Sequence, residues 1–172
     1  MAVIPERLTG YSVFRNGSER VGTSDVELPS LEALTDTVSG AGIAGEVDSP
    51  TIGHFGSMRT TLNFRTLDIP MFKLSGPKSQ ALDFRGAQQV YDSAASEYKS
   101  IPVRVSVRGI PVNTTLGTFE NNAATGSSIE LECTYLMVMV DGVKVIEIDK
   151  YNYICFIDGV DHLAVVKQQL GL

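Results

Sequence analysis

Apolar and polar residues alternate with a period of two along several parts of this 172-residue chain. In residues 58–65 the even positions are mainly apolar and the odd positions are polar, and residues 101–108 alternate in the same way. Successive side chains of a strand point to opposite faces of a sheet, so this period predicts two half-buried strands. Pro102 fits the second strand only at its start or on a sheet edge, because it has no amide hydrogen to donate.

Three dipeptides typical of hairpin turns separate further strand-like segments. Asn16-Gly17 lies between strands expected at 11–15 and 19–28. Asp141-Gly142 lies between strands expected at 131–140 and 143–150, and Asp158-Gly159 ends a strand expected within 151–157. Tight turns and a period of two together predict a mainly antiparallel β protein.

Two short segments have the signals of a helix instead. Asp68 can cap a helix that has Pro70 in its first turn and Gly76 just past its end, the order in which these two residues usually occur. Residues 161–170 are expected to form a second, amphipathic helix, whose apolar face consists of Leu163, Val166 and Leu170.

One hairpin, at residues 136–148, has apolar side chains on both of its faces. Strands of this kind are covered on both sides. The second cover could be a helix of the same domain or another subunit, and a deep core strand explains the pattern equally well. The apolar residues concerned are Leu136, Met137, Val138, Met139, Val140, Val143, Val145, Ile146 and Ile148.

Residues 32–56 show no clear period and are rich in glycine, serine and threonine. Gly40, Gly42 and Gly45 match the spacing of the dinucleotide-binding motif, but that motif needs a strand before it and a helix opening within it. No apolar strand precedes these glycines, and Pro50 and β-branched residues follow them. We therefore interpret the segment as a long mobile loop that can approach another surface closely.

Composition indicates an ordered chain. With 43% hydrophobic and 20% charged residues, 172 residues are enough for one compact domain spanning 1–172. The net charge of −6 is divided between −2 for residues 1–86 and −4 for residues 87–172, so no basic region is available to grip nucleic acid. The first ten residues lack a basic run followed by an apolar stretch, and no secretory signal is expected.

The chain offers no constellation of catalytic or metal-binding residues. Cys133 and Cys155 lie in strand-like segments and are expected to be reduced, buried thiols. The two histidines, His54 and His162, are distant from each other, so no metal site is expected. The spacing of Ser75 and Lys78 suits a nucleophile and its base, but Gly76-Pro77 breaks the helical turn that such a pair requires. The sequence thus predicts a protein without enzymatic activity and without a cofactor.

Arginines occupy polar positions of two predicted strands: Arg59 and Arg65 on one, Arg104 and Arg108 on the other. A groove for a polyanion is conceivable. The acidity of the whole chain favours a solvated face, or ion pairs with acids of a neighbouring subunit.

Three stretches, in this order, resemble one protein family: LPSLEALTDTVSGAGIAGEVDSPTIGHFGSM, ALDFRGAQQVYD and VMVDGVKVIEIDKYNYICFIDGVDHLAVVKQQLGL. With the hairpin at Asn16-Gly17, they resemble the major tail tube proteins of contractile-tailed bacteriophages and R-type tailocins over nearly the whole chain. Residues 101–121 contribute least to the resemblance.

The resemblance implies an antiparallel β-sandwich or split barrel with one or two short helices. Six subunits would close into a hexameric ring with a shared inner β-barrel, and rings would stack into a hollow tube inside a contractile sheath. Closure removes sheet edges that would otherwise aggregate. The implied location is a virion tail or tailocin particle assembled in the bacterial cytoplasm.

The resemblance also implies partners. These are other copies of the chain, the tail sheath protein, a tape-measure protein in the lumen, and the baseplate and tail terminator proteins. DNA would be only non-specific cargo in transit, and no small-molecule ligand is expected. Six copies would carry −36, and a lumen of that sign would repel DNA.

By position, the loop after the first hairpin would reach the adjacent ring. Its expected interface residues are Thr35, Thr37, Ser39, Gly40, Ala41, Gly42, Ile43, Ala44, Gly45, Glu46, Asp48 and His54. Candidate residues of strands that meet between subunits are Arg59, Arg65, Arg104, Arg108, Met137 and Met139.

Two alternatives remain open. A tube protein of a type VI secretion system or another phage-derived injection machine would have the same fold, with different partner genes. A monomeric β-barrel that binds a small apolar ligand would instead need a ligand-sized apolar cavity.

Overall fold

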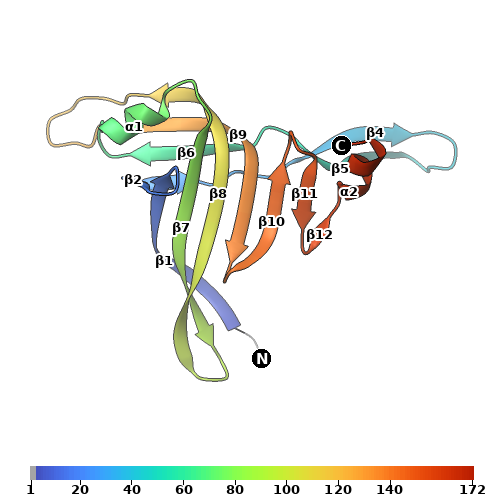
Figure 1. The fold of residues 1–172 in the computed structure, drawn as a ribbon, viewed down its shortest axis with the longest axis horizontal. Coiled ribbons are helices and arrows are strands. Elements are labelled where there is room, and N and C mark those ends of the chain that lie inside the picture. The colour runs from blue at the N-terminus through green and yellow to red at the C-terminus, as the bar shows by residue number, and fades with distance from the viewer. Residues whose placement is uncertain (1–2) are drawn as a thin grey trace.

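Figure 1 shows a computed structural model of the chain, which describes residues 3–172. Met1 and Ala2, part of the expected domain 1–172, lie outside the described residues. The described chain is mainly antiparallel β with two short helices, so the predicted fold class is confirmed. The elements are β1 (Val3–Arg15), β2 (Glu19–Val21), β3 (Asp25–Glu27), β4 (Ala33–Ser39), β5 (Glu46–Phe55), β6 (Arg59–Phe64), α1 (Ile69–Leu74), β7 (Gln80–Asp92), β8 (Glu97–Thr115), β9 (Ser127–Val140), β10 (Val143–Asp149), β11 (Ile154–Ile157), β12 (Val160–Asp161) and α2 (Ala164–Gln169).

The three predicted hairpin turns are confirmed. Asn16, Asp141 and Asp158 each have φ of 50°, and the glycine that follows each of them also has a positive φ. Two consecutive turn residues with positive φ match the right-handed twist of the strands on either side. The turns therefore join β1 to β2, β9 to β10 and β11 to β12 as antiparallel neighbours.

Strand β9 organises the main sheet. One of its edges pairs with β8 from Ser128 to Val140, while its other edge pairs first with β6 and then with β10. The ten-stranded sheet runs in the order β12-β11-β10-β9-β8-β7-β1-β2, and β3 pairs with β6. A second sheet consists of β4 and β5. The main sheet thus bends at β9, and residues of β1, β6, β7, β8, β9 and β10 enclose one hydrophobic core.

The alternation predicted for residues 58–65 is confirmed. Met58, Thr60, Leu62 and Phe64 are buried, and the residues between them are exposed or half-buried. The predicted first helix is also confirmed as α1. The Asp68 carboxylate accepts a hydrogen bond from the Ile69 amide at 2.7 Å. Beyond this cap, α1 buries Met71 and Leu74 in the core.

Pro102 lies where β8 has lost its second neighbour. Its carbonyl accepts a hydrogen bond from the amide of Asp141, in the turn that ends β9, at 2.9 Å. Beyond this point β8 pairs only with β7, so the position is an edge, as expected for proline. Strand β8 is much longer than the predicted 101–108, because it continues along β7 as a ribbon that ends at the turn 93–96 and projects from the body of the molecule (Figure 1).

The strand predicted at 19–28 is in fact two strands with different partners. Strand β2 pairs with β1, whereas β3 pairs with β6. The chain changes partner at Gly22–Ser24, where the Ser24 amide donates to the Asn63 carbonyl and the Tyr11 hydroxyl donates to the Ser24 carbonyl. These two bonds fix the crossing between the two parts of the sheet.

The interpretation of residues 32–56 as a long mobile loop is wrong for most of the segment. Strands β4 and β5 form an antiparallel hairpin that projects at one end of the longest axis (Figure 1). Only residues 40–45, at its tip, form a loop. Gly40, Gly42 and Gly45 all have positive φ, which favours glycine, and they are followed by strand β5 and not by the helix that the dinucleotide motif requires.

The second predicted helix is shorter than expected. It covers Ala164–Gln169 and not residues 161–170. The Asp161 carboxylate accepts hydrogen bonds from the amides of Cys155 and Leu163, both at 3.1 Å, which keeps Asp161 outside the helix in β12. Of the expected apolar face, Leu163 is buried just before α2, but Leu170 is exposed.

Candidate assembly surfaces

The β4–β5 hairpin exposes nearly all of its residues. Every residue of β4 is exposed, as are all residues of β5 except Gly53 and Phe55, which are half-buried. An isolated two-stranded hairpin is at best marginally stable in water. The expected interface residues Thr35, Thr37, Ser39, Gly40, Ala41, Gly42, Ile43, Ala44, Gly45, Glu46, Asp48 and His54 all lie in this hairpin and are all exposed.

Three contacts fix the base of the hairpin to the body. The Gly56 amide donates to the Glu32 carbonyl at 2.9 Å, and the Lys150 ammonium donates to the Gly56 carbonyl at 2.6 Å. Gly53 has φ of +70°, and a Cβ there would lie 2.6 Å from Cγ of Leu163. The leucine before α2 therefore packs directly against the backbone of β5 and sets the direction in which the hairpin projects.

A polar network covers the face of β7–β10 that lies away from the core. Asp83, only 8% exposed, accepts two hydrogen bonds from Arg104, at 3.2 and 2.8 Å, and one from Ser106 at 2.5 Å. Arg85 lies 3.5 Å from the same carboxylate. Burial raises the pKa of Asp83, but these hydrogen bonds and the two arginine charges outweigh it, so the pKa lies below its ordinary value.

The same face continues onto β9 and β10. The Tyr135 hydroxyl donates to Glu147 at 2.9 Å, and burial, followed by this bond, raises the pKa of Tyr135 to about 12. The hydrogen bond from Lys144 lowers the pKa of Glu147. Arg108 stacks over the Tyr135 ring, 5.0 Å from its centroid. With Asp83 and Glu147 against Arg85, Arg104, Arg108 and Lys144, this face carries both signs of charge and is not an acidic surface.

The structure separates the four arginines expected on two strand faces. Arg104 and Arg108 lie on the outward face of β8. Arg59 forms ion pairs with Glu130 and Glu132 of its own chain, at 3.0 and 3.4 Å. Arg59 and Arg104 therefore pair with acids of their own chain, because the register of the sheet brings these acids alongside. Arg65 is exposed at the end of β6.

Met137 and Met139 alternate with core residues. Leu136 is buried, and Val138 packs against the core from the same face. The two methionines point the opposite way and are half-buried; Met137 and Arg108 line the same shallow hollow. Apolar residues thus occupy both faces of the β9–β10 hairpin, as the sequence indicated.

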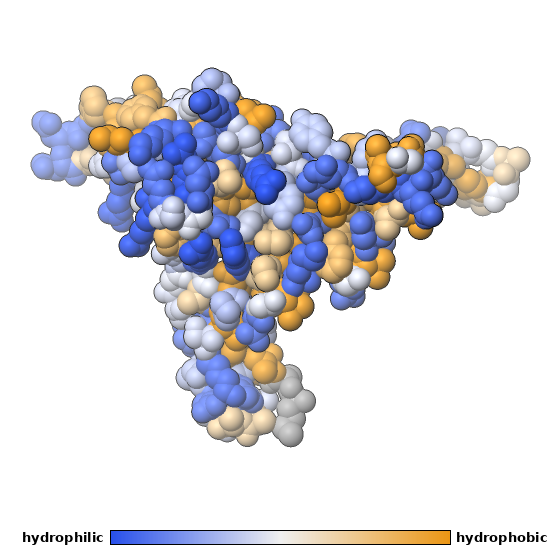
Figure 2. All heavy atoms as spheres, in the orientation of Figure 1, coloured by the Kyte–Doolittle hydropathy of each residue, from blue (hydrophilic) through white to orange (hydrophobic). Residues whose placement is uncertain are grey.

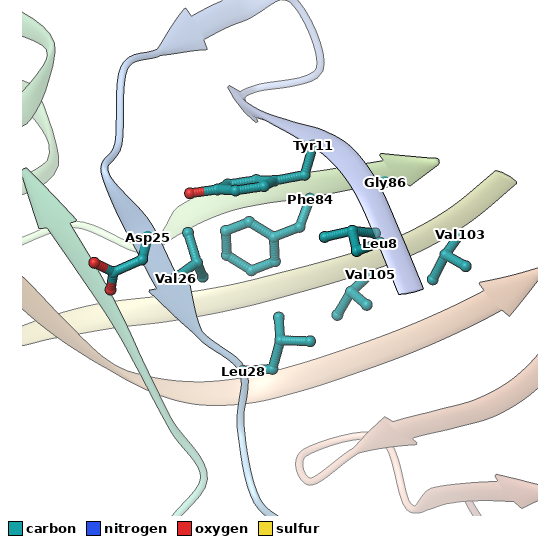
Figure 3. Close-up of a pocket in the computed structure, with 9 residues that line it drawn as sticks. All are labelled: Leu8, Tyr11, Asp25, Val26, Leu28, Phe84, Gly86, Val103 and Val105. Carbon is teal, nitrogen blue, oxygen red and sulfur yellow. The ribbon is translucent and has the colours of Figure 1, made fainter. Parts of the chain in front are cut away.

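An open apolar groove of about 210 Å³ lies between β1, the β3 segment and the β7–β8 ribbon (Figure 3). Tyr11, Phe84 and Leu28 are among its walls. Asp25 is its one charged lining residue among those described, and in Figure 3 its carboxylate points away from the apolar side chains. That carboxylate accepts hydrogen bonds from Asn63 and Ser24. The groove has no set of polar groups that would orient a small ligand, which argues against the ligand-binding alternative.

The thiols have the character of core residues. Cys133 and Cys155 are both buried and unpaired, which agrees with the prediction of free thiols. Burial, and then the charge of Glu132, raises the pKa of Cys133 to about 12. Burial likewise raises the pKa of Cys155.

Among residues 3–172, no three or more His, Cys, Asp or Glu side chains are grouped to hold a metal ion. Neither described helix is long and apolar enough to cross a membrane.

Sequence reasoning missed the Asp83 network. Its members come from two strands, and only the register of β7 with β8 brings Asp83 opposite Ser106. The available signal was the stretch Leu82-Asp83-Phe84-Arg85, where two charged residues alternate with two apolar ones that turn out to be buried.

A family model described as phage tail tube protein FII matches residues 5–171. The tail tube protein of Escherichia phage P2 is 28% identical over 174 residues, which cover 98% of this chain and 99% of the phage protein.

Two cryo-EM structures of an extracellular contractile injection system contain chains of similar fold. One is the PVC sheath/tube terminator in its extended state, with a TM-score of 0.55 and 16% identity over 78% of this chain and 96% of that chain. The other is the PVC sheath-tube complex in its extended state, with a TM-score of 0.52 and 15% identity over 75% of this chain and 87% of that chain. At these identities the likeness concerns the fold alone.

Proposed function

The chain belongs to the phage tail tube protein FII family, structural tail tube proteins and not enzymes, and from this we propose that it builds a hollow tube from stacked hexameric rings. A protein of this family is a component of a virion tail or contractile injection particle. In the proposal, the whole chain, residues 1–172, acts as one tail-tube domain. The tube is driven through the target envelope when the sheath contracts and can conduct DNA.

The observation that carries the proposal is the exposed β4–β5 hairpin. Its base is fixed by Lys150 and Leu163, yet its strands bury almost nothing within the chain. A hairpin so exposed gains most of its stability from a surface supplied by another molecule. In a stack of rings, that molecule is a copy in the adjacent ring, and residues 35–54 supply the contact.

Ring closure is supported by the two ends of the main sheet. Val3–Ser12 of β1 pair only with β7 in the described part of the chain, and β12 ends the sheet on the other side with two residues. Two different open edges on one subunit allow head-to-tail pairing, and head-to-tail contacts close into rings when the rotation permits. Closure would satisfy the backbone groups of both edges.

The polar face of β7–β10 is the candidate lining of the channel. Two acids, Asp83 and Glu147, lie there among four basic residues, Arg85, Arg104, Arg108 and Lys144, so we expect this lining to be slightly basic and not acidic. We propose that DNA or a tape-measure protein occupies this channel, where the ion pairs with Asp83 and Glu147 weaken the attraction of the basic residues for a polyanion. The net charge of −6 would lie mainly elsewhere on the subunit.

Other partners follow from the proposed place in the particle. We propose contacts with the tail sheath protein on the outside of the tube, and with the baseplate and tail terminator proteins at its two ends. The neighbouring genes would distinguish a phage or tailocin from a type VI secretion system or another injection machine.

Electron microscopy of the purified protein, alone and with its baseplate initiator, tests the proposal. Rings or tubes are expected in at least one of these conditions. Deleting residues 40–45 should leave the far-ultraviolet circular dichroism of the subunit nearly unchanged but block stacking. Protein that stays monomeric under both conditions would contradict the proposed function, and tubes of normal length from the deletion variant would contradict the role of the hairpin.

A further inference from the structure

The hairpin is acidic as well as exposed. Residues 32–56 contain four acidic residues and no lysine or arginine, a formal charge of −4 out of −6 for the whole chain. Asp36 and Asp48 accept hydrogen bonds within the hairpin, from the Thr37 amide and hydroxyl. The side chain of Glu46, at the start of β5 beside the tip, is exposed and forms no hydrogen bond or ion pair with any residue from 3 to 172.

The opposite end of the longest axis carries α1 and the loop 116–126 (Figure 1). This end, too, exposes large apolar side chains: Ile69 and Phe72 on α1, and Phe119, which is 86% exposed, on the loop. Figure 2 shows hydrophobic atoms gathered there, in orange at the upper left. Backbone hydrogen bonds from Thr125 and Gly126 to the Arg65 carbonyl hold the loop against the end of β6.

Three cations at this end lack an acidic partner. Within residues 3–172, Arg20, Arg65 and Lys78 form no ion pair, unlike most other basic residues of the chain. Arg20 and Arg65 line two adjoining hollows that share Gly22–Ser24. The exposed acids Asp68 and Glu120 lie at the same end, so the surface offers discrete positive positions among apolar side chains.

We propose that this end, defined by Arg20, Arg65, Lys78, Ile69, Phe72 and Phe119, receives the β4–β5 hairpin of a second copy of the chain. The inference rests on the proposed function and adds the receiving surface. The hairpin brings exposed Ile43, Val38 and Val47 together with unpaired Glu46, and the receiving end brings exposed apolar side chains together with unpaired cations. Since donor and receiver lie at opposite ends of one subunit, the contact repeats from copy to copy and can propagate along a tube.

Apolar burial would supply most of the affinity. Exposed ion pairs contribute little on their own, but opposite charges select the register and reject wrong contacts. The sign of the charge at Glu46 should therefore matter more than its hydrogen-bonding capacity.

Disulfide cross-linking tests the contact directly. Cys133 and Cys155 are buried, so introduced cysteines would be the accessible thiols. Tubes of a variant that carries both Ile43→Cys and Phe119→Cys should form a ladder of covalent multimers on mild oxidation, and neither single variant should do so. The matched control combines Ile43→Cys with Tyr98→Cys, an exposed position on the β7–β8 ribbon. A ladder from the control and none from the first pair would overturn the proposal.

Charge reversal gives a second measurement, which also decides the case if the cysteine variants fail to assemble. Glu46→Lys and Arg65→Glu should each raise the protein concentration needed for tube formation by about tenfold, because like charges would face each other. The double variant should return to within about twofold of the wild type, because the pair is restored with its signs exchanged. Lys167→Glu, an equal charge change on α2, should not rescue Glu46→Lys.

These outcomes separate the receiving surface from the proposed function. If the wild-type protein forms tubes but neither cross-linking nor compensation involves the α1 end, the receiving surface is wrong and the tube stands. Equal rescue by Lys167→Glu would mean that only net charge matters, which also overturns the receiving surface. If the wild type forms no rings or tubes at all, the proposed function itself fails.

Discussion

Strand β6 and the β4–β5 hairpin are both antiparallel, yet they differ in what stabilises them. Strand β6 pairs with β9, and its apolar face is buried in the core, in which Leu62 and Leu131 are fully buried. The hairpin has Ile52 at 70% exposure and pairs only with itself. The core strand therefore folds with the subunit, whereas we expect the hairpin to reach its full stability only in the assembly.

The largest difference between the two regions should appear on truncation of apolar side chains. Leu131→Ala in β9 should lower the free energy of unfolding of the subunit by about 2–5 kcal/mol, because it leaves a cavity in the core. Ile52→Ala in β5 should change it by less than about 0.5 kcal/mol. Urea denaturation of the unassembled protein, followed by circular dichroism, measures both. Equal losses would mean that the hairpin belongs to the subunit core.

The direction of the hairpin should depend on the contact at its base. Gly53→Ala places a side chain at positive φ, which costs about 1–2 kcal/mol. The new methyl group would also collide with the side chain of Leu163. Limited proteolysis of the unassembled variant should cleave the hairpin faster than in the wild type, and tube yield should fall. Gly10→Ala, at a position in β1 with open space around it, is the control and should leave hairpin cleavage unchanged. A normal tube yield from Gly53→Ala would show that the Leu163 contact does not set the hairpin direction.

A smaller loss of stability is expected from a change on the polar face of β7–β10. Asp83→Asn should lower the free energy of unfolding by about 1 kcal/mol near neutral pH, because Arg104 and Ser106 lose a charged acceptor. The pKa of Asp83 is lowered in the folded state, so its contribution is present above the unfolded pKa of about 4 and is lost as pH falls through the folded pKa. Unfolding curves of the two proteins should therefore converge at low pH. If the difference in unfolding free energy between the wild type and the variant did not change with pH, the effect would come from packing and not from the charge of Asp83.

The smallest response is expected from the two native thiols of the folded subunit. Because burial raises the pKa of Cys133 to about 12, and raises that of Cys155 as well, neither should react with a thiol reagent in the folded subunit near neutral pH. Both should react in urea. Ile52→Cys provides the exposed reference and should react at once in both conditions. Rapid labelling of a native cysteine without denaturant would indicate that the core opens.

The difference between the two regions also explains what the sequence could predict. The period of two at 58–65 was readable because one face of β6 is buried within the same chain, and burial selects apolar residues. In β4, Thr35, Thr37 and Ser39 alternate with Asp36 and Val38, and both faces are exposed, so no apolar period marks the strand. The sequence therefore suggested a loop where the chain forms a hairpin.

The outward face of the sheet was predictable only in part. The positions of Arg104 and Arg108 on a polar face followed from alternation along β8. Their partners did not, since Asp83 lies 21 residues before Arg104 and Tyr135 lies on a third strand. Such pairs depend on the register between strands, which a single strand pattern does not contain.

Hydrogen–deuterium exchange of the amides in residues 33–39 and 46–55 tests the central claim most directly. The claim is that the hairpin is ordered chiefly by contact with another copy. In the unassembled subunit these amides should exchange far faster than those of β9, and in purified tubes their protection should approach that of β9. Equal protection of the hairpin in subunits and tubes would contradict the account.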